Sequence, residues 1–136
     1  MDASVFLYAY LKPRKTLNAN IVHLKANAKA IVKRINSGER VATALPKVSE
    51  VANILEAAVS LPQSHSIIEE LVDCPNVLLL EPTRADYLDA VEAAKEAGVG
   101  LNDAVAYVLM KKNGISEVYS FDKHFDQFKD LARVQE

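Results

Sequence analysis

Four acidic residues lie where the predicted helices begin or the predicted strands end: Asp2, Glu50, Asp103 and Asp122. In a parallel α/β sheet such positions can meet at one edge. No lysine or arginine near Asp103 or Asp122 in the sequence has a spacing that would neutralise them. Carboxylates that gather without a counter-charge take up protons or hold a cation, and oxygen ligands suit Mg²⁺ or Mn²⁺. These residues predict a divalent-metal site that could activate water against a phosphodiester.

The four acids are not equally informative when each is taken alone. Asp103 is followed by seven consecutive apolar residues, 104–110. A helix that is apolar on all sides is buried, so the Asp103 carboxylate must be hydrogen-bonded, paired or metal-bound. Asp122 follows a short predicted strand. Glu50 lies on the shoulder of an amphipathic helix, where a surface role is an equally good interpretation, and Asp2 alone would be a helix cap.

Helices and strands alternate along the chain. Apolar periodicity and start and stop residues predict helices over residues 5–11, 21–35, 46–60, 67–72, 87–97 and 104–112, and strands over residues 40–45, 77–80, 117–121 and 132–134. Ser66 and Glu69 are predicted to form a capping box for the helix over 67–72. The class predicted is α/β with a mostly parallel sheet, in a single domain over residues 1–136.

The composition narrows the range of functions. The chain has 136 residues, half of them apolar, and a formal net charge of −2. It has no apolar run of the ~18 residues that a membrane span needs and no signal peptide. Its single cysteine, Cys74, has no internal partner and is interpreted as a small buried residue. A cytoplasmic protein without membrane contact is therefore predicted.

The charge is unevenly distributed. Residues 1–50 carry a net charge of +6, and residues 51–136 carry −8. An ordinary solvated surface is one interpretation. A basic arm that faces a polyanion beside an acidic metal site is the other, and both stay open.

Two segments of the second half resemble a known family. Asn102-Asp103-Ala104 opens an apolar helix, and residues 119–126 follow with the sequence YSFDKHFD. Together they resemble the C-terminal signature of PIN-domain nucleases, above all the VapC-type ribonuclease toxins of prokaryotic toxin–antitoxin pairs. Asp2-Ala3-Ser4 and Ser49-Glu50-Val51 are similar to the segments around the family's first two acids. The resemblance thus covers nearly the whole chain and implies a three-layer α/β/α sandwich.

The resemblance also implies roles for individual residues. Asp2, Glu50, Asp103 and Asp122 would coordinate Mg²⁺ or Mn²⁺ in an endoribonuclease that prefers single-stranded RNA. Such a protein would be held in check by an antitoxin and would form a homodimer. Hydrogen-bonding support or an outer carboxylate would come from four further residues: Ser4, Asn102, Ser120 and Asp126. His124 is interpreted as a solvated loop histidine.

A basic loop follows the first predicted helix. Lys12, Arg14 and Lys15 surround Pro13, which ends that helix. Cationic side chains bind the phosphates of nucleic acids without regard to sequence. These three residues are the candidates for contact with the RNA backbone.

One departure from the family pattern concerns the start of the chain. In PIN domains an apolar strand precedes the first acid and forms the middle of the sheet, whereas here only Met1 precedes Asp2. Two expectations stay open: either the sequence starts late, or the central strand is short or missing and Asp2 lies on a fraying terminus.

Three other functions fit parts of the sequence. A PIN domain that has lost catalysis could act as an RNA- or protein-binding module. A phospho-acceptor receiver domain has a similar length, but it needs paired acids after its first strand. A phosphatase of the haloacid-dehalogenase type needs an acid two residues after the first, where this chain has Ser4.

Overall fold

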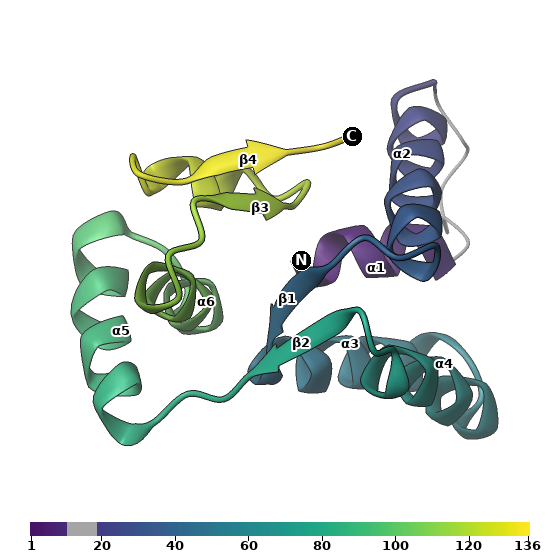
Figure 1. The fold of residues 1–136 in the computed structure, drawn as a ribbon, viewed down its shortest axis with the longest axis horizontal. Coiled ribbons are helices and arrows are strands. Elements are labelled where there is room, and N and C mark those ends of the chain that lie inside the picture. Colours follow the sequence, from purple (N-terminus) through teal and green to yellow (C-terminus); the bar gives the residue numbers. More distant parts are fainter. Residues whose placement is uncertain (11–18) are drawn as a thin grey trace.

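The computed structural model describes residues 1–10 and 19–136 and places short parallel strands between two groups of helices (Figure 1). The helices are α1 (Ala3–Tyr10), α2 (Ala19–Asn36), α3 (Leu45–Ala58), α4 (Leu61–Asp73), α5 (Arg84–Ala97), α6 (Leu101–Lys112) and the 3₁₀ helix η1 (Lys123–Gln127). The strands are β1 (Val41–Ala44), β2 (Val77–Leu80), β3 (Glu117–Tyr119) and β4 (Ala132–Val134). This arrangement confirms the predicted α/β/α class. No helix in the described part of the chain is long and apolar enough to cross a membrane.

The strands form two separate pairs. β1 lies parallel to β2, with Val41 opposite Val77, and β3 lies parallel to β4, with Val118 opposite Arg133. Within residues 1–10 and 19–136, no strand lies between β1 and β3. The first two residues of the chain occupy part of that gap, as predicted for a short or missing central strand. The two pairs of strands are called the half-sheets below.

Met1 and Asp2 connect the half-sheets through their backbone. The Met1 amino group donates a hydrogen bond to the Ala42 carbonyl of β1 at 2.6 Å, and the Asp2 N–H donates to the Tyr119 carbonyl of β3 at 2.9 Å. Successive N–H groups of an extended chain point to opposite sides. Two residues are therefore enough to reach both half-sheets.

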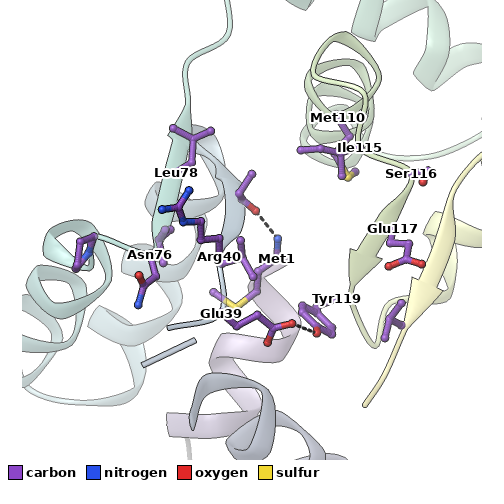
Figure 2. A pocket seen from close by; sticks show the side chains of 15 residues that line it. Met1, Glu39, Arg40, Asn76, Leu78, Met110, Ile115, Ser116, Glu117 and Tyr119 are labelled. Atoms are coloured by element: carbon purple, nitrogen blue, oxygen red, sulfur yellow. Dashed lines mark hydrogen bonds between the residues drawn. The ribbon is translucent and has the colours of Figure 1, made fainter. Parts of the chain in front are cut away.

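A cavity of about 840 Å³ lies in the gap beside Met1, which forms part of its wall (Figure 2). Its wall includes Val41 and Ala42 of β1, Leu78 of β2 and Met110 of α6. The Tyr119 O–H donates a hydrogen bond to Glu39 Oε1 at 2.7 Å, and Figure 2 shows this contact beside the cavity.

Each group of helices has its own apolar core against the strands. The first lies among α1 to α4 and β2, and its buried residues include Val5, Phe6, Ile31, Ile35, Val51, Leu55 and Leu71. The second lies among α5, α6, β3 and η1, and its buried residues include Ala90, Ala104, Val105, Leu109, Met110, Val118, Phe125 and Phe128. The apolar run after Asp103 is buried as predicted, and it anchors the start of α6.

One predicted helix start is wrong. α4 begins at Leu61 rather than near Ile67, and its capping box consists of Ser60 and Gln63 instead of Ser66 and Glu69. The sequence around Pro62 predicts a break, but proline is tolerated in the first turn of a helix because the N–H groups there have no partner in the helix.

Candidate active site

Four elements bring the predicted acids together. Asp2 precedes α1, Glu50 lies in the first half of α3, Asp103 lies in the first turn of α6, and Asp122 is the N-cap of η1 just after β3. A lysine on α3, Lys47, lies among three of them. Three of the acids, Asp2, Asp103 and Asp122, lie at a helix start or just after a strand, whereas Glu50 lies inside α3.

Lys47 is the residue that the sequence argument missed. Its Nζ lies 2.7 Å from Asp103 Oδ1, 3.0 Å from Asp2 Oδ1 and 3.3 Å from Glu50 Oε2, and its side chain is only 2 % exposed. The expectation that no basic residue neutralises Asp103 is therefore wrong. The pairing joins residues 56 positions apart, so local spacing could not show it. One signal was present: Lys47 precedes Val51 by four residues, which places it on the buried face of α3.

The charges of Lys47 and Asp2 stabilise each other. Burial alone would lower the pKa of Lys47, but Asp2, Asp103 and Glu50 raise it above its ordinary value. Burial alone would likewise raise the pKa of Asp2, but Lys47 together with hydrogen bonds from Ser4 and Ser120 lowers it. Both groups are therefore charged at neutral pH, and a pair of this kind is stable in the interior only when each charge is well compensated.

Asp2 is held firmly rather than loosely. It is 5 % exposed, and its Oδ2 accepts hydrogen bonds from Ser4 Oγ at 2.8 Å and from Ser120 Oγ at 2.9 Å. Ser4 and Ser120 thus lie where the family resemblance placed supporting residues. The expectation of a fraying Asp2 is wrong, because its backbone N–H and its carboxylate both bind groups at the end of β3.

Asp122 and His124 form the more exposed side of the site. Asp122 Oδ1 accepts a hydrogen bond from the His124 backbone N–H at 2.9 Å and lies 2.8 Å from His124 Nδ1. The Asp122 N–H donates to Ser120 Oγ at 2.9 Å, which fixes the turn after β3. One ligand atom from each of Asp103, Asp122 and His124 falls within 4.8 Å of the others. His124 is therefore a further candidate ligand, which its place in a polar loop did not reveal.

The remaining candidates lie away from this centre or outside the described residues. Asn102 is exposed and lines a shallow surface pocket together with Glu50. Asp126 pairs with Arg133 at 3.0 Å, so its charge is compensated beside β4. The three basic residues of the predicted RNA-binding loop lie in the stretch 11–18, which the structure does not describe: Lys12, Arg14 and Lys15.

The residues present fit a divalent cation. Three carboxylates surround the ammonium of Lys47 and a fourth, that of Asp122, lies near Asp103, so negative charge is in excess. Glu50 Oε2 is buried, and apart from its 3.3 Å ion pair with Lys47 it has no hydrogen-bond partner in the described part of the chain. Carboxylate oxygens suit Mg²⁺ and Mn²⁺, and an imidazole is better suited to transition metals.

Comparison with known proteins defines the class. The sequence model of the PIN domain matches residues 1–131. The chain therefore belongs to the PIN-domain family. Its structure is similar to that of VapC20 from Mycobacterium tuberculosis, a toxin that cleaves the sarcin–ricin loop, with a TM-score of 0.76 and 17 % sequence identity. The match covers 99 % of this chain and 97 % of VapC20. A search of curated protein sequences finds no match.

Proposed function

We propose that this chain is a Mg²⁺- or Mn²⁺-dependent endoribonuclease and the toxin of a toxin–antitoxin pair. The observation that carries the proposal is the meeting of Asp103 and Asp122, which come from separate elements, beside His124. Membership of the PIN-domain family and a fold shared with a ribonuclease toxin support the same interpretation. A cytoplasmic location, an antitoxin partner and a homodimer belong to this proposal.

The residues of the site have distinct tasks in this proposal. Asp103, Asp122 and His124 would hold the divalent ion, with Glu50 and Asp2 completing the acidic surroundings. When bound, such an ion would lower the pKa of a coordinated water and stabilise charge on the phosphodiester. Ser4 and Ser120 orient Asp2 by hydrogen bonds. Glu50, whose side chain is 34 % exposed, would accept a proton from an attacking water.

A cleavage assay on a mixed RNA pool tests the function. The wild-type chain should cleave with Mg²⁺ or Mn²⁺ and stop when EDTA is added. Asp103→Asn should reduce the rate by more than the ~10–100-fold that is typical of changes outside the direct ligand shell. The fold should persist, because the amide keeps the side-chain shape and Lys47 keeps its contacts with Asp2 and Glu50. Unchanged cleavage by Asp103→Asn or in EDTA would contradict the proposal.

We also propose that Lys12, Arg14 and Lys15 bind the RNA backbone. Neutralising all three should weaken binding evenly across RNA sequences. The slope of log K against log[salt] should fall by about 0.7 for each phosphate of single-stranded RNA that the protein no longer binds. A matched variant neutralises three lysines of α5 and α6, Lys95, Lys111 and Lys112, and should leave the slope unchanged. Equal slopes for wild type and the loop variant would support an ordinary solvated surface.

A non-catalytic PIN domain is the second candidate. One observation favours it: Lys47 already pairs with three of the four acids. Such a protein would bind RNA or a protein partner without cutting RNA. Retained RNA binding without cleavage at millimolar Mn²⁺ would identify it.

A further inference from the structure

Lys47 is a cation built into the centre of an acidic site. Among the described residues it is the largest side chain that is fully buried. An isolated ammonium in such a place would be strongly destabilising, whereas here three carboxylates lie within 3.3 Å of it. Its Nζ also lies 5.6 Å from the centroid of the Phe125 ring, which adds a cation–π contact.

The acids divide into two groups that share Asp103. The inner group consists of Asp2, Glu50 and Asp103, and it surrounds the Lys47 ammonium. The outer group consists of Asp103, Asp122 and His124, whose ligand atoms lie within 4.8 Å of one another. The side chain of Asp2 is 4 % exposed and that of the shared Asp103 is 15 %, whereas Glu50 and Asp122 are exposed by 34 % and 32 % and His124 by 68 %. Solvent therefore reaches both Asp122 and His124 of the outer group, but among the inner acids it reaches mainly Glu50.

We propose that Lys47 is a permanent counter-ion which takes one of two possible cation positions in the site and directs a single divalent ion to the outer group. The proposal rests on the proposed nuclease function, because it presumes that the site binds a divalent ion. It assigns Lys47 the task of a positioning residue that acts through Asp103.

Burial and charge explain why Lys47 stays while an ion binds. If the ammonium left, Asp2 would keep its charge in an almost fully buried place with only neutral hydroxyl partners. Lys47 itself would have to withdraw a side chain that is only 2 % exposed from the interior. A divalent ion at the outer group requires neither change, because Asp122 is partly exposed, His124 is exposed, and the described contacts of Lys47 include neither of them.

Charge also explains why one ion suffices. Paired divalent ions in phosphodiester-cleaving sites lie about 3.5–4 Å apart and share ligands. Asp103 is the shared ligand here, and one of its oxygens already contacts the ammonium at 2.7 Å. A second divalent ion on the inner side would therefore meet the charge of Lys47 at close range. Removing that charge should open the inner position.

The test is the number of Mn²⁺ ions bound per chain, measured by calorimetric titration and by electron paramagnetic resonance of free Mn²⁺. The wild-type chain should bind one ion. Lys47→Met should bind two, because the inner carboxylates lose their counter-ion while the apolar stem is kept. Lys95→Met is the matched control: it removes the same charge from an exposed pair with Glu92 and should still bind one ion. Two ions on the wild-type chain, or one on Lys47→Met, would overturn the proposal.

A second measurement uses the unmodified chain, in case Lys47→Met does not fold. The ammonium groups of ¹⁵N-lysine-labelled protein can be followed by NMR during titration with diamagnetic Mg²⁺. The Lys47 signal, assigned through its side-chain carbons, should be protected from exchange and should remain so at saturation. Loss of that protection would show that the ion displaces the ammonium, and it would overturn the proposal.

The two hypotheses fail in different ways. A wild-type chain that cleaves RNA with Mn²⁺ but binds two ions would contradict the counter-ion role and would still support the nuclease function. A chain that binds no Mn²⁺ would contradict both hypotheses, because both require a bound ion.

Discussion

The gap between the half-sheets has two ends, of which one is filled by polar side chains and the other is a cavity. At the carboxyl ends of β1 and β3, Asp2, Lys47 and Ser120 fill the space with charges and hydrogen bonds. At the amino ends, a cavity of about 840 Å³ lies between the same strands. The comparison teaches that acids from separate elements can be brought together without a continuous sheet. Two residues of backbone and a network of side chains are enough to align the acids.

The largest effect is expected where the network is most buried. Ser120 is fully buried, and its hydroxyl donates to Asp2 and accepts from the Asp122 N–H. Ser120→Ala should cost about 1–3 kcal/mol of unfolding free energy, because a buried N–H loses its partner. Denaturant titration measures this. Ser64→Ala is the matched control, because the buried Ser64 hydroxyl has no hydrogen bond in the described part of the chain. Equal losses in both variants would show that the network adds nothing.

Filling the empty end should stabilise the fold more than it changes the site. Four or five apolar residues placed ahead of Met1 could form a strand between β1 and β3 and would turn the buried amino group into an amide. A fully buried apolar side chain contributes about 1.5–3 kcal/mol, so the free energy of unfolding should rise. Mg²⁺ affinity should stay the same, because Asp2 is already held by Ser4 and Ser120. Denaturant titration and calorimetry would measure both quantities. A glycine–serine extension of equal length should give no gain, and equal unfolding free energies for all three chains would contradict the idea.

The cavity wall should tolerate change with little effect on the site. Tyr119→Phe removes the hydrogen bond to Glu39 and the 3.4 Å contact from Arg34. The expected loss is about 0.5–1.5 kcal/mol of unfolding free energy, with Mn²⁺ affinity unchanged. Thermal unfolding and metal titration on the same sample would check both. A fall in Mn²⁺ affinity would mean that the two ends are coupled.

The last prediction concerns stability in acid, and its effect at neutral pH is the smallest. Lys47, Ser4 and Ser120 outweigh burial and hold the pKa of Asp2 below its ordinary value of 3.8. The unfolded chain therefore binds this proton at a higher pH than the folded chain does. Asp2 therefore adds to the free energy of unfolding when the pH is above its ordinary pKa. This contribution is lost as the pH falls through the lower pKa that Asp2 has in the folded chain. Unfolding of metal-free protein between pH 6 and 2 should show this loss, and Asp2→Asn should show a shallower one. Identical profiles would contradict it.

Much of the site was predictable because it depends on local patterns. The apolar run after Asp103 predicts a buried helix start, and the unalternating residues of β2 predict a strand inside a parallel sheet. Asp122 follows a strand and sits at the edge where such strands end. Each inference needs only a dozen neighbouring residues.

The rest depends on contacts between distant segments. Lys47 meets Asp103 across 56 residues, and no spacing rule links them. Asp2 looked loosely held because Ser4 is its one supporting residue nearby in the sequence. Its other partners, Tyr119 and Ser120, lie at the other end of the chain. Tertiary packing therefore decided both points where the sequence argument failed.

The hydrogen bond between Ser120 and Asp2 also determines when the site can assemble during protein synthesis. These residues are 118 positions apart, and contacts of such high sequence separation form late in folding. While the ribosome has released only the first hundred residues, α6 and β3 have not yet emerged and Asp2 has neither Tyr119 nor Ser120 to bind. A partly made chain therefore carries Glu50 and Lys47 but no assembled acidic centre. The proposed nuclease would then become active only after nearly all of it has left the ribosome.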